Sequence, residues 1–364
     1  MSEPIGLGII GVGRWAGAHA RAAARSSVVR IVGCFSRSSE NREAYQRAYE
    51  IPAAAPSLEE LLANPLVEAV IVSTPNDAHA GQVARVIATG KPVLVDKPVS
   101  VDVTEGIELL RIVSAGAIPV GVAHHARRLA GHRAARQWIE SGRAGTVRIA
   151  HADFSNLGGS NLKAEAWHRT ARGSEAGVLI QVGIHQIDNL QYLLGPATSV
   201  NARFMYRDLG PRMPDAAVVT MAHANGALST VTTSWTTPGH YRLDLQGTGG
   251  NLVFSLDHRH WTSGDVDDHG ELLLQPLEGE GGLFPTEKGD PLRDQLEELG
   301  KAARVGTPMM IGVVEGLRAV AVVQAAVRSA RSNGAPVDLA MLLTEGGATP
   351  GEIDHLLSPS VHPR

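Results

Sequence analysis

Short apolar runs alternate with helix-like segments over residues 5–122 of this 364-residue chain, and this alternation limits the possible folds more than any other feature. The apolar runs predict strands at Ile5–Ile10, Val28–Phe35, Ala69–Ser73, Val93–Val95 and Pro119–Val122. The predicted helices cover Arg14–Ser26, Glu40–Tyr49, Ser57–Ala63, Ala78–Thr89 and Thr104–Ser114. This order is typical of βαβ units, so we expect a parallel sheet covered by helices.

A glycine-rich turn joins the first predicted strand to the first helix. It reads Gly11-Val12-Gly13-Arg14-Trp15-Ala16, a G-x-G-x-x-A pattern. The glycines permit a tight turn and a close approach of the backbone to a pyrophosphate, while the helix N-terminus supplies N–H donors. The pattern is weak by itself, but here it opens a βαβ series. It therefore predicts a Rossmann domain whose cofactor contacts include Gly11, Gly13, Arg14, Trp15 and Ala16.

The end of the second strand bears on which nicotinamide cofactor is bound. An NAD site usually has an acidic residue here, whereas an NADP site brings in arginine. This chain has Ser36, Arg37 and Ser38, and no carboxylate before Glu40. Hydroxyls and a guanidinium suit a 2′-phosphate, so NADP is preferred over NAD. The alternative is that these are solvated polar residues at the start of a helix.

Polar residues also follow the next strand, in the stretch "VIVSTPNDAH". Ser73, Thr74, Pro75 and Asn76 end the strand, and His79 stands at the start of a helix. Ligands of parallel sheets bind beyond the carboxyl ends of the strands, so we expect these residues to line the cofactor groove. For Asn76 and His79, helix capping is an equal alternative.

A lysine closes the apolar run Val93–Val95, in "PVLVDKPVSVD". Asp96, Lys97 and Pro98 stand where the edge of a parallel sheet usually presents its ligand site. We therefore expect these three residues beside the cofactor.

The second half of the chain has a different texture. Consecutive strands are predicted at Val147–Phe154, Val200–Tyr206, Ala216–Ala222, Ala227–Thr236, Tyr241–Gln246 and Asn251–Leu256. Asn225-Gly226 is a strong hairpin signal between two of them. Helices are expected at His132–Ser141, Ile184–Leu194 and Val313–Ser332, and a loop over Asp257–Asp290. The fold class is thus α/β: an N-terminal Rossmann domain with a parallel sheet, and a C-terminal α/β domain with a large, mostly antiparallel open sheet.

Three segments follow from this pattern. Residues 1–123 form the dinucleotide-binding domain, 124–340 a domain for substrate binding and oligomerisation, and 341–364 a tail. The tail is rich in Gly, Pro, Ser and His, a composition compatible with poor order.

The stretch "VLIQVGIHQIDNLQYLLG" places Gln181, His185 and Asp188 around the start of a predicted helix. Asp188 shares a helical face with His185, three residues away. A helix N-terminus lowers the pKa of an imidazole, which suits a residue that gives or takes a proton near neutral pH. The alternative is a half-buried histidine packed on the sheet.

Composition excludes several other classes. The net charge of -4 and the lack of a basic block give nucleic-acid binding little support. The single cysteine, Cys34, rules out an internal disulfide framework, and no apolar stretch is long enough for a membrane span, so a cytoplasmic protein is expected. Acids and histidines gather at Asp257, His258, His260, Asp265, Asp267, Asp268 and His269. They show no fixed ligand spacing, so we predict no metal site.

Taken in order, G-x-G-x-x-A, "STPNDAH", "DKP" and "GxHxxD" resemble the Gfo/Idh/MocA family of nicotinamide-dependent oxidoreductases over about residues 5–340. The resemblance implies hydride transfer on sugars, cyclic polyols or related diols, and an open sheet that makes a homodimer or homotetramer. It places the family lysine on Lys97, with Asp96 where glutamate is commoner and a proline, often cis, at Pro98. The family histidine falls on His185 and the following acid on Asp188, but Gln181 replaces a carboxylate.

The resemblance also implies substrate contacts outside these motifs. "GVAHHARRLAGH" matches the segment that enters the substrate cleft, and places His125 and Arg127 there; a charged helix surface is an equal account of the arginine. In "AEAWHRT", Trp167 could stack on a sugar ring and Arg169 could bond to it, although Trp167 could simply be core. The predicted substrate-binding residues are Lys97, His125, Arg127, Trp167, Arg169, Gln181, His185 and Asp188.

The predicted reaction interconverts a secondary alcohol and a ketone, with Lys97 and His185 as catalytic residues. His185 would take the hydroxyl proton while Lys97 stabilises the alkoxide, or Lys97 would transfer the proton while His185 orients the substrate. Two other classes remain open. One is a redox-neutral enzyme with a tightly bound cofactor, acting by elimination or hydrolysis. The other is a non-catalytic nucleotide sensor.

Overall fold

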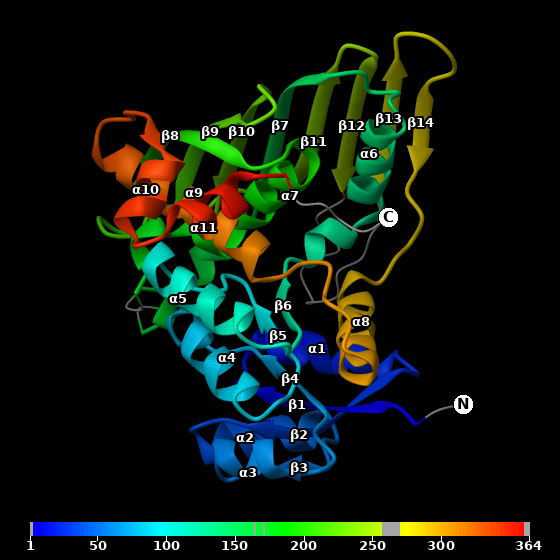
Figure 1. Cartoon of the computed structure of the whole chain (residues 1–364), viewed down its shortest axis with the longest axis vertical. Coiled ribbons are helices and arrows are strands. Elements are labelled where there is room, and N and C mark those ends of the chain that lie inside the picture. Colours follow the sequence, from blue (N-terminus) through cyan, green and yellow to red (C-terminus); the bar gives the residue numbers. More distant parts are fainter. Residues whose placement is uncertain (1–2, 164, 170–171, 257–269, 360–364) are drawn as a thin grey trace.

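The computed structural model describes residues 3–163, 165–169, 172–256 and 270–359. They form two domains, each built on one sheet (Figure 1). The first sheet has six strands in the order β3-β2-β1-β4-β5-β6, and the second has nine in the order β14-β13-β12-β11-β7-β10-β9-β8-β15. The predicted fold class is confirmed.

The first sheet is parallel throughout, as the βαβ alternation predicts. Its strands are β1 (Ile5–Ile10), β2 (Val29–Phe35), β3 (Ala53–Ala54), β4 (Ala69–Val72), β5 (Val93–Asp96) and β6 (Val120–Ala123). Its helices are α1 (Arg14–Ala24), α2 (Ser39–Ala48), α3 (Leu58–Ala63), α4 (His79–Ile87) and α5 (Val103–Ser114), with a short 3₁₀ turn η1 (Asn76–Ala78). Strands β1 and β4 are fully buried, because helices cover both faces of the sheet.

The second sheet is antiparallel except where β7 pairs with β10. Its strands are β7 (Val147–Ser155), β8 (Ala197–Met205), β9 (Ala216–His223), β10 (Leu228–Ser234), β11 (His240–Gly247), β12 (Gly250–Leu256), β13 (Gly270–Pro276), β14 (Gly282–Pro285) and β15 (Val337–Asp338). The predicted hairpin at Asn225-Gly226 joins β9 to β10, and Gly226 takes a φ of 84°.

The helices of this half lie on one side of the second sheet, except α8, which packs on α1 of the first domain (Figure 1). The α-helices are α6 (Ala130–Glu140), α7 (Ile184–Leu194), α8 (Pro291–Val305), α9 (Val313–Arg331), α10 (Leu339–Glu345) and α11 (Pro350–Leu357). Shorter turns are η2 (His125–Arg128), η3 (Gly159–Asn161), η4 (Trp167–Arg169), η5 (Ser174–Ala176) and the π-helical turn η6 (Leu179–Gly183). Burial alternates along β9 and β11, so one face of the sheet meets these helices and the other is open.

Helix α9 joins the two domains. It packs on α5 of the first domain and on β8 of the second. At Gly106 of α5, a Cβ atom would lie 2.5 Å from Leu317 of α9, so the two helices approach closely. Gln324 of α9 also accepts a hydrogen bond from the Val103 N–H at 2.8 Å. These contacts fix the edge of the first sheet relative to the second domain.

Two parts of the C-terminal half differ from the sequence prediction. The loop expected over Asp257–Asp290 contains β13 and β14, which extend the sheet beside β12. Their sequences, rich in Leu but also in Gly, Gln and Glu, give a weak strand signal. The segment from 341 contains the end of α10 and the whole of α11. Arg318 of α9 fixes it by donating to the carbonyls of Leu356 and His355 at the end of α11.

Candidate active site

The glycine turn has the geometry that a dinucleotide requires. Gly11 takes a φ of 92°, and a Cβ there would lie 2.2 Å from the carbonyl oxygen of Ser73. Gly13 precedes α1, and a Cβ there would meet nothing within 4 Å. No side chain caps the start of α1 and no acid lies in its first turn. Its free N–H groups therefore suit a pyrophosphate.

After β2, the side chain of Arg37 is exposed to solvent. Ser38 caps α2 by accepting from the Asn41 N–H at 3.2 Å, and the Ser36 carbonyl accepts from Arg42 at 2.9 Å. Arg37 is exposed and has no hydrogen bond or ion pair with any described residue. Its guanidinium is thus available for an anion, while the Ser38 hydroxyl is already used as a cap.

His79 connects the two loops that follow β4 and β5. It is 1% exposed, and its Nδ1 and Nε2 lie 2.6 Å and 2.8 Å from the carbonyl oxygens of Pro98 and Thr74. Both ring nitrogens are therefore occupied by the two loops that follow β4 and β5. His79 thus joins these two loops, and its direct contact with a cofactor stays a prediction. Asn76 is likewise buried, at the start of η1.

Asp96, at the end of β5, is held by two donors. Ser73 Oγ donates to Oδ2 at 2.6 Å, and His19 Nε2 lies 2.8 Å from Oδ1. Burial alone would raise the pKa of Asp96, but His19 and Ser73 together lower it to about 2. Asp96 is therefore a carboxylate fixed inside the protein.

Lys97 reaches from the first domain into the second. Its Nζ donates to the backbone carbonyl of Gln181 at 2.6 Å, and the Lys97–Pro98 peptide bond is cis. Burial lowers the pKa of Lys97 to about 8, although the charge of Asp96 acts in the opposite direction. The lysine thus lies at the boundary between the domains with a pKa close to neutral pH.

Gln181 takes part through its backbone, in the π-helical turn η6 that precedes α7. Turns of this kind often mark functional sites, because the local unwinding frees backbone groups from the regular helical ladder. The Gln181 side chain is partly exposed and has no hydrogen bond to a described residue. Its amide is therefore available to a ligand.

Histidine rings surround Lys97. His125 lies between Trp15 of the glycine turn and His185 of α7, with ring centroids 5.4 Å and 4.9 Å away. His124 is 6.1 Å from His185. Burial and then the charge of Lys97 lower the pKa of His125 to about 3 and that of His185 well below its usual value. These imidazoles are neutral at pH 7, and no described residue hydrogen-bonds to either ring nitrogen of His185.

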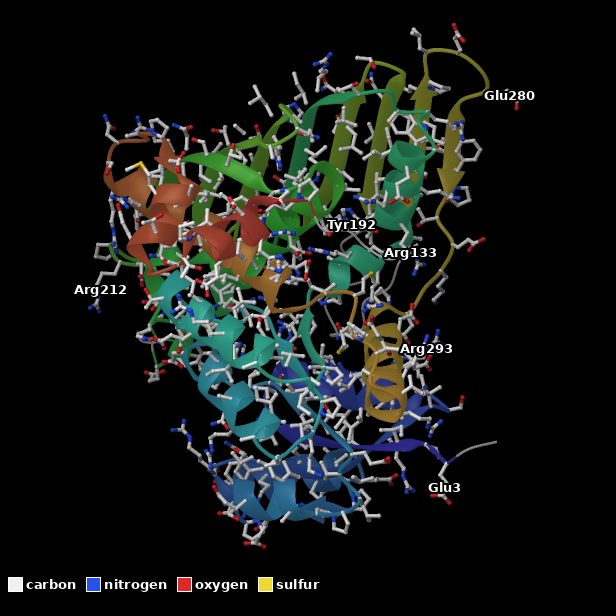
Figure 2. All side chains as sticks on the ribbon, in the orientation of Figure 1. Glu3, Arg133, Tyr192, Arg212, Glu280 and Arg293 are labelled. Atoms are coloured by element: carbon white, nitrogen blue, oxygen red, sulfur yellow. The ribbon has the colours of Figure 1, made fainter. Side chains whose placement is uncertain are left out.

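Arg127 and Asp188 form a buried ion pair. Arg127 donates from Nε and one Nη to the two carboxylate oxygens of Asp188, both at 2.6 Å. The guanidinium also lies 5.0 Å from the ring centroid of Tyr192, a residue near the centre of the view in Figure 2. The two side chains are 3% and 1% exposed, and each is the main partner of the other. Direct contact of this pair with a substrate stays a prediction.

The loop around η4 presents aromatic rings. Trp167 stacks on His168 at 3.8 Å and is partly exposed, which keeps it available to a sugar ring. Arg169, by contrast, donates to the carbonyls of Leu209 at 2.9 Å and Lys163 at 3.2 Å. It therefore holds this loop to the segment after β8 instead of facing a substrate.

Three histidines were not among the predicted site residues, yet they adjoin the site. His19 lies within hydrogen-bond distance of Asp96, and the ring of His124 lies near that of His185. Burial and then the charge of Lys97 lower the pKa of His168 to about 4. The double histidine at 124–125 and the "WHR" stretch are visible sequence signals for two of them. His19 lies in an alanine-rich helix, where nothing in the sequence distinguishes it.

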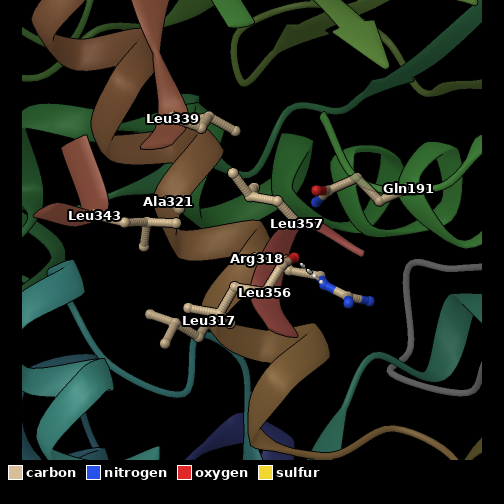
Figure 3. Close-up of a pocket in the computed structure, with 8 residues that line it drawn as sticks. All are labelled: Gln191, Leu317, Arg318, Ala321, Leu339, Leu343, Leu356 and Leu357. Atoms are coloured by element: carbon tan, nitrogen blue, oxygen red, sulfur yellow. Dashed lines mark hydrogen bonds between the residues drawn. The ribbon is translucent and has the colours of Figure 1, made fainter. Parts of the chain in front are cut away.

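Two pockets, both partly open to solvent, are lined by residues other than Lys97 and His185. The one in Figure 3 lies between α9, α10 and α11 and has a volume of about 10 Å³, too small for a substrate. A larger space of about 370 Å³ lies behind the Lys97 loop, where Val101 and Asp102 face α9. Among described residues, no group of His, Cys, Asp or Glu is placed to hold a metal ion. The acidic stretch at 257–269 lies outside them.

Comparison with known proteins agrees with this geometry. Residues 5–124 match the oxidoreductase family with an NAD-binding Rossmann fold, and residues 132–253 match the GFO/IDH/MocA C-terminal domain. The chain belongs to the Gfo/Idh/MocA family of oxidoreductases. No described helix is both apolar and long enough to cross a membrane.

Individual relatives differ in their named substrates. The chain is 31% identical to 1,5-anhydro-D-fructose reductase of Ensifer adhaerens over 198 residues, 53% of this chain and 58% of that protein. It is 24% identical to inositol 2-dehydrogenase of Rhizobium meliloti strain 1021, over 89% and 96% of the two chains. A solved oxidoreductase structure from Desulfitobacterium hafniense DCB-2 superposes with a TM-score of 0.87 at 32% identity, covering 94% of this chain and all of that one.

The two glycines of the turn give a matched pair of variants. Gly11→Ala forces a φ of 92° on a side chain that also meets Ser73, so it should lower the free energy of unfolding by about 2 kcal/mol or more. Gly13→Ala has room for its methyl and should change that free energy little, yet weaken binding of the nicotinamide dinucleotide at least ~10-fold. Urea unfolding and fluorescence titration measure the two effects; equal unfolding losses in both variants would contradict this assignment.

Proposed function

We propose that the protein is an NAD(P)-dependent oxidoreductase that interconverts a secondary alcohol and a ketone on a sugar, an inositol-like polyol or a related cyclic diol. The observation that carries the proposal is the position of Lys97. Its ammonium group lies at the domain boundary and its charge acts on His125 and His185. His125 in turn lies 5.4 Å from Trp15 of the glycine turn, centroid to centroid. When bound, a nicotinamide cofactor supplies or takes up the hydride.

The pKa values favour Lys97 as the proton-transfer group. A general acid or base works best when its pKa is near the operating pH, and the pKa of Lys97 is about 8. His185, whose pKa is well below its usual value, is a weak base but a good neutral hydrogen-bonding group. In alcohol oxidation the Lys97 amine takes the hydroxyl proton while His185 orients the oxygen. In ketone reduction the Lys97 ammonium returns that proton.

The substrate class rests on the relatives and on the kinds of side chain present at the site. Relatives at 24–31% identity are named 1,5-anhydro-D-fructose reductase, inositol 2-dehydrogenase and trans-1,2-dihydrobenzene-1,2-diol dehydrogenase, all acting on ring compounds that carry oxygen substituents. Trp167 offers a ring face to such a compound, and the Gln181 amide and His125 offer polar contacts. Gln181 binds a hydroxyl without taking its proton, because an amide does not ionise.

NADP is the preferred cofactor. Arg37 is exposed and unpaired among described residues at the end of β2, and no acid lies there to repel a phosphate. The Desulfitobacterium protein is provisionally described as NADPH-dependent, while other structures of this fold hold NAD⁺ or NADH.

The experiment that tests the proposed function is a turnover assay with a panel of anhydro-sugars, inositols and cyclic diols. We expect one of these compounds to change the absorbance of the reduced nicotinamide in proportion to product. Product without a net change in cofactor would instead indicate a redox-neutral enzyme. Cofactor binding with no product across the panel would indicate a sensor.

Arg37→Ala tests the choice of cofactor. Loss of the guanidinium should weaken NADP at least ~10-fold and NAD by less than about 2-fold, because only NADP carries the 2′-phosphate. Arg47→Ala, at an exposed arginine on the following helix α2, serves as the control. Calorimetric titration with both cofactors gives the ratio; equal losses for NADP and NAD would remove the reason for preferring NADP.

We propose that a second copy of the chain packs on the open face of the nine-stranded sheet. Ile149, Val218 and Leu228 are 40%, 47% and 58% exposed on that face. Light scattering should show a dimer or tetramer, and Val218→Asp should shift it toward the monomer, because a charge is costly in a closed interface. Leu66→Asp, at an exposed site on the first domain, should not. A monomeric parent protein would overturn this proposal.

A further inference from the structure

Three side chains form a connected group behind the catalytic lysine. Asp96 lies in the middle, with Ser73 from the end of β4 on one side and His19 from α1 on the other. His19 is fully buried, and the Asp96 side chain is 17% exposed. Because the carboxylate accepts and does not donate, His19 must carry its proton on Nε2. Its Nδ1 is buried and has no hydrogen-bond partner in the described part of the chain.

We propose that His19 is a positioning residue for Lys97: with Ser73 it holds the Asp96 carboxylate behind the lysine, so that Asp96 supports the ammonium charge without pairing with it. The inference rests on the proposed function, in which Lys97 transfers the proton.

The geometry separates the two charges. Asp96 is the last residue of β5, and Lys97 is the first residue after it. Asp96 uses its two oxygens on His19 and Ser73, and Lys97 uses its Nζ on Gln181. No ion pair joins Asp96 to Lys97 among the described residues. A carboxylate free to rotate would instead compete with the substrate for Nζ.

The groups around Lys97 show that its positive charge depends on Asp96. His79, His124, His125, His168 and His185 all respond to the charge of Lys97, and burial lowers the pKa of each. They therefore supply no negative charge. Asp96 is the group that raises the pKa of Lys97 against burial. Without it the amine would lose its proton at a lower pH.

His19 also connects this charge to the cofactor turn. It lies on α1, whose N-terminus follows Gly13 and carries Trp15. One hydrogen bond thus ties the helix that receives the pyrophosphate to the strand that presents Lys97. A shift of about 1 Å in a catalytic group can cost ~100-fold in rate, so this tie has a measurable effect.

The first measurement needs neither substrate nor cofactor. The pKa of the Lys97 amine is read from the pH dependence of its chemical labelling, followed by mass spectrometry. Asp96→Asn removes the charge at nearly constant shape and should lower that pKa by about one unit from about 8. An unchanged or raised pKa would overturn the role of Asp96, whatever the substrate proves to be.

The second measurement is a double-mutant cycle on kcat, started once the parent enzyme shows turnover. His19→Leu should lower kcat at least ~10-fold, and His19→Gln, which keeps a donor near the Nε2 position, should recover most of the loss. In an Asp96→Ala background, His19→Leu should cost less than about 2-fold more, because its partner is gone. Additive losses, or equal losses for Leu and Gln, would show that His19 only packs α1. Thermal melting of each variant separates this outcome from loss of fold.

Absence of turnover in the parent enzyme would count against the proposed function alone. The labelling result would still decide the role of Asp96.

Discussion

One hydrogen bond between the domains organises this molecule: Lys97 Nζ donates to the Gln181 carbonyl, 84 residues further along the chain. It joins the carboxyl edge of the parallel sheet to the π-helical turn in front of α7. For this bond to form, α9 must hold the second domain against α5, and the loops after β4 and β5 must be fixed, which His79 does through the carbonyls of Thr74 and Pro98. Fold and site therefore depend on the same contacts.

The electrostatics follow from burying a cation at that boundary. Burial lowers the pKa of Lys97 to about 8, Asp96 opposes the shift, and the lysine charge helps to keep His125 and His185 neutral. The buried pair Arg127–Asp188 lies behind this group, where it fixes η2 against α7. Breaking such a pair leaves a buried charge without a partner, so these residues matter for the site.

The sequence predicts the first domain well because its signals are local. The glycine turn and the apolar runs depend on neighbouring residues, and both are found where expected. The cis bond at Pro98 agrees with the family resemblance, which gives a proline that is often cis there. The bond from Lys97 to the Gln181 carbonyl in the second domain was not predicted. Long-range contacts could not be predicted. The charged side chains of Arg127, Asp188 and Arg169 are of kinds found in binding sites, but each bonds to other groups of this protein. Strands β13 and β14 form because β12 offers an edge with which β13 can pair.

The central claim is that Lys97 performs the chemistry and does not hold the cofactor. Lys97→Ala separates the two roles when kcat and the dissociation constant of NADP are measured on the same preparation. The account predicts that kcat falls at least ~1,000-fold, as expected for a lost proton-transfer group, while the dissociation constant stays within about 3-fold. A variant that turns over at a rate near that of the parent, or that loses NADP binding in proportion to activity, would contradict it.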